Sequence, residues 1–158
     1  MEEGYFMEES MRTEETFSLR EAITEVFPGK RQDIRTYSPL TLAYIGDAVY
    51  DLIIRTMVVN KGNRPVNDLH HITVKYVSAN AQAKMVQALN EYLTEEEQAV
   101  YRRGKNAKPH TTAKNASIAD YLKATGFEAV LGYLYLTDQM ERALELVKKG
   151  ILLTGLEL

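Results

Sequence analysis

Two acidic residues stand in long, mostly apolar stretches of this 158-residue chain. Asp47 lies within LTLAYIGDAVYDLIIRTMVV, residues 40–59, and Glu128 lies within YLKATGFEAVLGYLYL, residues 121–136. Hydrophobic residues surround both acids, so we expect each helix to be buried on more than one side. A buried carboxylate without a partner is costly. If the two acids meet, each raises the pKa of the other, and a hard divalent cation such as Mg²⁺ would relieve the repulsion.

The same two acids also have purely structural interpretations. Asp47 could accept hydrogen bonds from the N-terminus of a neighbouring helix or pair with an arginine. Glu128 could pair with Lys123 or Arg142. The residue types alone therefore leave the metal site and the structural ion pair open as alternatives.

A basic segment precedes the second acid by about twenty residues. YRRGKNAKPHTTAKN, residues 101–115, contains no acid and five basic residues, which are Arg102, Arg103, Lys105, Lys108 and Lys114. Gly104 and Pro109 favour a mobile loop over a regular element. An all-basic loop is typical of a surface that meets a polyanion, so we expect these side chains to contact nucleic acid.

Helical periodicity accounts for the elements that must position these residues. Pro39 is expected to begin the helix that contains Asp47, and Gly62 to follow its end. Thr94 and Glu97 have the spacing of a capping box. The expected helices are Phe17–Phe27, one from Pro39 that Asn60, Lys61 and Gly62 close, Asp68–Tyr92, a short helix from Thr94, Ala116–Leu136, and a last one capped by Asp138 and Glu141 and ended by Gly150. No strand pattern of convincing length occurs, so the predicted fold class is all-α.

Composition narrows the class of protein further. The first 15 residues hold six glutamates and one arginine, so we expect residues 1–15 to be a flexible acidic tail and residues 16–158 a single domain. There is no cysteine, which excludes disulfides and zinc–thiolate sites and favours a reducing compartment. No apolar run free of charge is long enough to span a bilayer, and the predicted location is the cytoplasm, with no membrane partner.

Three segments, taken in order, resemble the catalytic domain of the ribonuclease III family. LAYIGDAVYDLII is similar to the family's signature helix, and GFEAVLGYLYL to its second acidic motif. RRGKNAK, upstream of Glu128, resembles Mini-ribonuclease III, the short branch of the family that lacks a double-stranded-RNA-binding domain. The resemblance covers roughly residues 35–150.

The resemblance implies a homodimeric helical bundle that acts as a magnesium-dependent endoribonuclease, with Mn²⁺ as a substitute metal. Asp47 and Glu128 match the family's essential acids, as catalytic residues and metal ligands. The implied substrate is double-stranded RNA, in particular the paired ends of the large-subunit (23S) ribosomal RNA precursor, cut to 5′-phosphate and 3′-hydroxyl ends. Assistance from a ribosomal protein is a further expectation. The Ile45, Val49 and Leu52 face is either core or dimer seam.

The chain also departs from the longer members of the family. Those members carry acids where this sequence has Leu40, Ala43 and Thr125. Asp51, one turn after Asp47, could assist through water. The missing acids motivate an alternative, a non-catalytic double-stranded-RNA-binding relative. A helical protein-interaction module without an RNA role is a third hypothesis.

Overall fold

The computed structural model describes residues 17–30, 32–107 and 117–158, and every regular element within them is a helix. These residues divide into two units, one within Met1–Arg31 and the other Gln32–Leu158. The elements are α2 (Leu19–Val26), η1 (Ile34–Thr36), α3 (Pro39–Asn60), α4 (Val66–Val77), α5 (Ala79–Leu89), η2 (Asn90–Tyr92), α6 (Glu95–Asn106), α7 (Ile118–Leu136) and α8 (Met140–Leu153). The all-α prediction is confirmed, whereas the predicted acidic tail lies outside the described residues.

The described part of the first unit contains a short amphipathic helix. α2 begins after Ser18, whose hydroxyl accepts a hydrogen bond from the amide of Glu21 at 3.1 Å, and it ends before the predicted Pro28-Gly29 stop. Its side chains at Val26 and Phe27 are 70% and 73% exposed. The sequence therefore predicted this helix correctly.

The ends of α3 follow the local sequence closely. Ser38 caps the helix by accepting from the amide of Thr41 at 3.1 Å, and Pro39 occupies the first helical position. Proline suits that position because its fixed φ matches the helix and its missing N–H is not needed there. Gly62, just past the C-terminus, has φ +135°, which only glycine adopts readily. The predicted start and end of this helix are both confirmed.

The predicted single helix Asp68–Tyr92 is wrong, because the chain breaks at Ser78. This residue has extended backbone angles, ends α4 and caps α5, where its Oγ accepts from the amide of Ala81 at 3.2 Å. The apolar positions on either side keep helical spacing across the break, so periodicity alone did not reveal it. The serine hydroxyl replaces a backbone acceptor at the start of the second helix.

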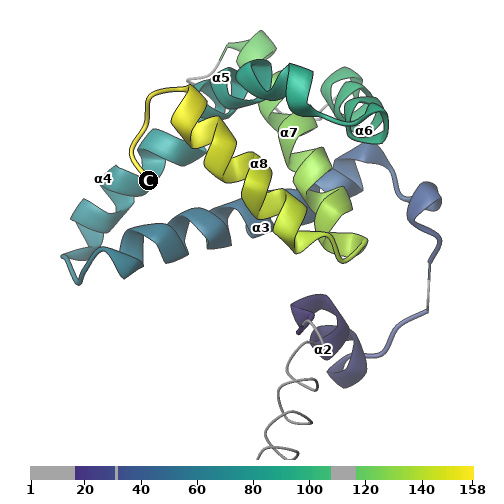
Figure 1. Ribbon diagram of the computed structural model, residues 1–158. Helices are drawn as coiled ribbons and strands as arrows, with labels where there is room; N and C mark the ends of the chain where they lie inside the picture. The colour runs from purple at the N-terminus through teal and green to yellow at the C-terminus, as the bar shows by residue number, and fades with distance from the viewer. Residues whose placement is uncertain (1–16, 31, 108–116) are drawn as a thin grey trace, which may run out of the picture. The chain divides into compact units, whose positions relative to one another are not determined.

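Helix α7 is the central element of the second unit, packed against α3, α5, α6 and α8 (Figure 1). Its crossing with α3 depends on two glycines. A Cβ atom on Gly46 would lie 2.7 Å from the carbonyl carbon of Glu128 and closer still to its oxygen. A Cβ on Gly132 would lie 2.9 Å from the carbonyl carbon of Leu42. The two backbones therefore touch directly, with no room for a side chain between them.

A second glycine pair joins α6 to α7. A Cβ on Gly104 would lie 2.8 Å from the Cβ of Ala129, and one on Gly126 would lie 2.8 Å from the carbonyl oxygen of Tyr101. Around these crossings lies a core of fully buried side chains, among which the largest are Tyr50, Phe127, Ile54, Met85 and Leu89. Tyr50 and Phe127 meet edge to face, with ring centroids 5.6 Å apart.

Helix α8 differs from its prediction at both ends. It begins at Met140 after Gln139, with no side-chain cap, and Asp138 instead adopts φ 57° in the preceding turn. Gly150 does not end the helix but lies inside it. A Cβ atom on Gly150 would lie 3.2 Å from the Cβ of Met85, so the glycine allows α5 to approach closely. The helix continues to Leu153, so this glycine serves the packing of α8 on α5.

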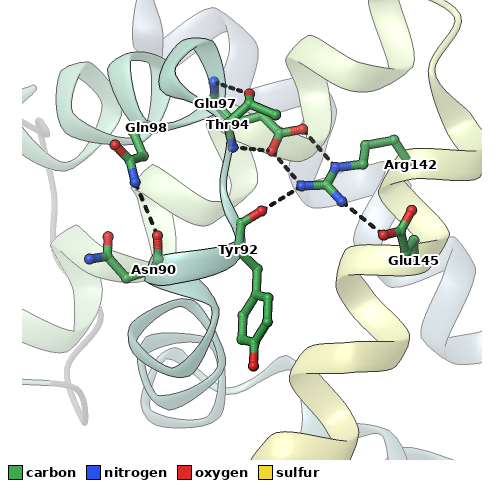
Figure 2. A network of polar contacts seen from close by, with 7 residues as sticks. All are labelled: Asn90, Tyr92, Thr94, Glu97, Gln98, Arg142 and Glu145. Carbon is green, nitrogen blue, oxygen red and sulfur yellow. Dashed lines mark hydrogen bonds and ion pairs between the residues drawn. The ribbon is translucent and has the colours of Figure 1, made fainter.

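A buried ion pair fastens α8 to the start of α6 (Figure 2). Thr94 and Glu97 form the predicted capping box, and Glu97 is 3% exposed. Arg142 donates to both carboxylate oxygens of Glu97, at 3.0 and 2.9 Å, and to the carbonyl oxygen of Tyr92 at 2.7 Å. These contacts lower the pKa of Glu97 against the opposing effect of its burial. A bidentate pair of this kind fixes relative orientation as well as supplying attraction.

Within the residues that the structure describes, no helix is both long and apolar enough to cross a membrane.

We predict that Gly46→Ala destabilises the protein by about 1–3 kcal/mol or more, because the added methyl group forces α3 and α7 apart. Urea denaturation of the full chain measures the change. Gly29→Ala is the matched control, since a Cβ at Gly29 meets nothing within 4 Å and its effect should stay within about 0.5 kcal/mol. Equal stability of the two variants would contradict the direct backbone contact.

Candidate functional site

The α3–α7 crossing brings Asp47 and Glu128 together. Gly46, directly before Asp47, lies against the backbone of Glu128 itself. The side-chain carboxyl groups of Asp47 and Glu128 lie within hydrogen-bond reach of each other. Two acids 81 positions apart in the sequence therefore form one pair of neighbouring carboxyl groups at the contact between two helices.

The exposure of the pair differs from the sequence prediction. Asp47 is exposed and Glu128 is half-buried, so the expectation that Asp47 is buried is wrong. The outward side of α3 carries apolar side chains that its own chain does not cover: Tyr44 is 82% exposed and Leu52 57% exposed. The pair is thus open to solvent on the Asp47 side.

Burial and repulsion together change the acidity of Glu128. Removal from water is the largest cause, followed by the contact with the Asp47 carboxyl, and the two raise its pKa from 4.5 to about 9. The side-chain amide of Gln82 acts in the opposite direction by hydrogen bonding to the charged form. Neither Lys123 nor Arg142 is among the groups that shift the pKa of Glu128. The structure therefore does not support the alternative in which Glu128 forms an ion pair with one of them.

Arg142 and Arg55 pair with acids other than Asp47 and Glu128. Arg142 is committed to Glu97 and also bonds Glu145 at 2.9 Å. Asp51 pairs with Arg55 at 2.9 Å along α3, a spacing of four residues that brings side chains together on a helix. Neither arginine therefore neutralises the Asp47–Glu128 pair.

The donor set fits a hard cation that retains water. Among residues 17–30, 32–107 and 117–158, no group of three or more histidine, aspartate or glutamate side chains gathers to hold a metal. Two carboxylates, one of them open to solvent, match the way Mg²⁺ is bound through one or two carboxylates with several waters. Asp47 and Glu128 are the residues that would hold it.

Sequence reasoning missed Gln82 of α5, which contacts Glu128. This glutamine is 3% exposed. It precedes Met85, Val86 and Leu89 at helical spacing, so it occupies the apolar face of its helix. A polar residue on an apolar face was the signal that could have identified it.

The basic segment is only partly a loop. Arg102, Arg103 and Lys105 lie in the last turns of α6, so the loop prediction is wrong for them, whereas Lys108 and Lys114 lie outside the described residues.

The glycine contact between α6 and α7 places the basic turn against α7. A Cβ on Gly126 would lie 3.2 Å from the backbone nitrogen of Lys105, and Gly126 precedes Glu128 by two residues. Arg102 and Arg103 are exposed. Positive side chains available to solvent therefore belong to a helix that packs on α7, the helix that carries Glu128.

We predict that, without divalent cations, the Glu128 carboxyl titrates near pH 9 and that Asp47→Asn lowers this midpoint. Between pH 4.5 and about 9 the folded chain holds a proton that the unfolded chain has released, so this group's contribution to stability falls as pH rises. Carbon-13 NMR of the glutamate side chains measures the midpoint. Urea titrations of wild type and Glu128→Gln at pH 6 and 8.5 check the sign, since the variant should gain relative stability at the higher pH. A midpoint at the ordinary value for glutamate would contradict the pairing.

Comparison with known proteins agrees with this geometry. Residues 40–139 match the model of the ribonuclease III domain. A Mini-ribonuclease 3 of Clostridium tetani is 50% identical over 119 residues, which cover 75% of this chain and 79% of that relative. The Mini-ribonuclease 3 of Enterococcus faecalis is 50% identical over 118 residues, or 73% of this chain and 89% of that one.

A solved structure shows the same fold. The crystal structure of a Fusobacterium nucleatum protein superposes with a TM-score of 0.69 and 30% sequence identity, over 75% of this chain and 96% of that protein. The family match includes both acids and the basic turn of α6. The resemblance seen in the three sequence segments is thereby confirmed, and the chain belongs to the ribonuclease III family, whose members are endoribonucleases that act on double-stranded RNA.

Proposed function

We propose that this chain cleaves double-stranded RNA by metal-dependent hydrolysis at the Asp47–Glu128 pair. The observation that carries the proposal is the meeting of the two carboxyl groups at the α3–α7 crossing, with the pKa of Glu128 raised and the site open on one side. Such a pair is poorly suited to a structural role, because it costs stability without a cation.

The residues divide the work by their burial. Half-buried Glu128 is held by the packing of α7, so it supplies a fixed oxygen donor. Exposed Asp47 faces solvent, where a phosphodiester and its attacking water can approach. A bound Mg²⁺, or Mn²⁺ in its place, would lower the pKa of that water and neutralise charge on the phosphate. The products are a 5′-phosphate and a 3′-hydroxyl.

The basic turn of α6 supplies the RNA contacts. Arg102 and Arg103 are exposed and Lys105 is half-buried, and the helix carrying them packs on α7, the helix that carries Glu128. A-form RNA is recognised mainly through its backbone and shape, which suits arginine and lysine contacts to phosphates. We propose that Lys108 and Lys114 extend this binding surface.

The apolar outer side of α3 favours a homodimer. Tyr44, Leu52 and Val59 are 82%, 57% and 59% exposed, and their spacing of eight and seven residues places them on one side of the helix. Val49, by contrast, is 7% exposed and belongs to the core, so only the exposed part of that face, which includes Leu52, is proposed as the dimer seam. A two-fold pairing through this stripe would relate two acidic sites across one duplex.

The likeness to Mini-ribonuclease 3 proteins supports a narrower substrate. We propose that the chain acts in the cytoplasm on the paired ends of the large-subunit ribosomal RNA precursor, with help from a ribosomal protein. The alternative, a non-catalytic double-stranded-RNA-binding relative, draws on the fact that only two acids gather at the site among the described residues.

We predict that Asp47→Asn and Glu128→Gln each slow cleavage of a duplex RNA at least about a hundredfold in Mg²⁺, because several kcal/mol of transition-state stabilisation depend on the held cation. Gel analysis of end-labelled RNA measures the rate and identifies the new ends. Glu141→Gln, which removes an exposed acid from α8, is the control and should cleave at the wild-type rate. Duplex binding without cleavage in Mg²⁺ or Mn²⁺ would favour the non-catalytic alternative.

We also predict that the double variant Arg102→Gln and Arg103→Gln binds duplex RNA more weakly and shows a salt slope of log K reduced by about 2, since each lost phosphate contact removes about 1. Fluorescence anisotropy at several salt concentrations measures the slope. Lys148→Gln, at an exposed position on α8, should leave both affinity and slope unchanged. An unchanged slope in the double variant would remove the α6 turn from the binding surface.

A further inference from the structure

Gln82 is an amide enclosed by the core next to the acidic pair. It lies in the first turns of α5 and is 3% exposed. Its helix also presents Met85, Val86 and Leu89 to the core, and these side chains are at most 1% exposed. An aliphatic residue of similar size would suit such surroundings better than an amide, so the amide needs a specific reason.

The break between α4 and α5 provides one anchor for this amide. The amide of Ala81 bonds the Ser78 hydroxyl at 3.2 Å, which leaves the carbonyl oxygen of Val77 to another donor. Gln82 Nε2 donates to that oxygen at 3.0 Å. The glutamine side chain is thereby fixed to the backbone at the point where the two helices meet.

The second contact of the amide is Glu128. An amide nitrogen carries two hydrogens, so one can remain on the Val77 carbonyl while the other points to the carboxylate. The lowering effect of Gln82 on the pKa of Glu128 is that of a donor to the charged form. The glutamine therefore links the backbone of the α4–α5 break to the carboxylate on α7.

The other end of the amide shows that packing alone does not account for Gln82. Its Oε1 is buried and has no hydrogen-bond partner among the residues that the structure describes. A buried acceptor without a donor costs stability, which methionine or leucine at this position would avoid. The two N–H hydrogens of Gln82 therefore account for the presence of an amide here, although its buried oxygen lowers stability.

We propose that Gln82 is a positioning residue that holds the Glu128 carboxylate in the orientation facing Asp47, ready for a divalent cation. The inference rests on the proposed function, because it assumes that the acidic pair binds the cation. Gln82 itself touches neither RNA nor the reacting atoms. It acts through Glu128, and its loss should weaken metal binding while leaving the fold and duplex affinity intact.

The test compares Gln82→Met with Gln87→Met, a matched change at an exposed position of the same helix. Mn²⁺ binding to the full chain without RNA is measured by titration calorimetry, and cleavage is measured against Mg²⁺ concentration. Gln82→Met should bind Mn²⁺ about 10- to 100-fold more weakly and require correspondingly more Mg²⁺, the usual effect of losing a residue that orients a ligand. Its KM for RNA at saturating metal should be unchanged, and Gln87→Met should match wild type.

The outcomes separate this inference from the function on which it rests. A folded Gln82→Met that binds Mn²⁺ as tightly as wild type overturns the positioning role alone. A wild-type chain that binds Mn²⁺ but cleaves no duplex overturns the nuclease, while the binding comparison still decides the role of Gln82. A wild-type chain that binds no Mn²⁺ overturns both.

A measurement on the wild-type chain covers the case in which Gln82→Met does not fold. In nitrogen-15 NMR spectra, Mg²⁺ should shift the side-chain amide signals of Gln82, because its carboxylate partner becomes a metal ligand. The signals of Gln87 should stay in place. Unchanged Gln82 signals at a Mg²⁺ concentration that shifts the backbone signals of Asp47 and Glu128 would overturn the proposal.

Discussion

The direct contact between the backbones of α3 and α7 is the constraint on which the site depends. Gly46 and Gly132 permit it, since each faces a carbonyl group of the other helix with no space for a methyl group. The contact sets both the distance and the rotation of the helices, and Asp47 and Glu128 then follow from their positions in the chain. A looser crossing, with side chains between the helices, would separate the acids by the width of those side chains.

Around this contact, the fold uses α7 as a common support. α3 brings one acid, α7 the other, α6 the basic turn, and α5 the amide that contacts Glu128. Glycines lie at the crossings of α7 with α3 and α6, so functional groups from several helices are gathered close to one axis. The Arg142–Glu97 pair fastens α8 to the start of α6 and thereby steadies the helix that carries the basic residues.

Local signals in the sequence were enough for most helix ends, because capping is a local interaction. Pro39, Gly62 and the Thr94–Glu97 box were all interpreted correctly. Gly150 was misinterpreted because a glycine that ends a helix and one that admits a neighbouring helix look alike in sequence.

The site was predictable only in part. The residue types left the convergence of Asp47 and Glu128 open, and the family resemblance favoured it, since periodicity says nothing of which helices cross. Periodicity also cannot tell whether an apolar face is covered by its own chain. For this reason the sequence did not predict that Asp47 is exposed. Gln82 was missed because its role depends on a neighbour 46 positions away.

The junction at Ser78 limits how the length of this chain can vary. One residue ends a helix and starts the next, so no spare loop absorbs an insertion there. Each added residue within the first turn of α5 would rotate the following side chains by about 100° and carry the buried amide away from its carboxylate. Length changes are far better tolerated in the exposed turn between α3 and α4, residues 61–65, where no core side chain depends on the register.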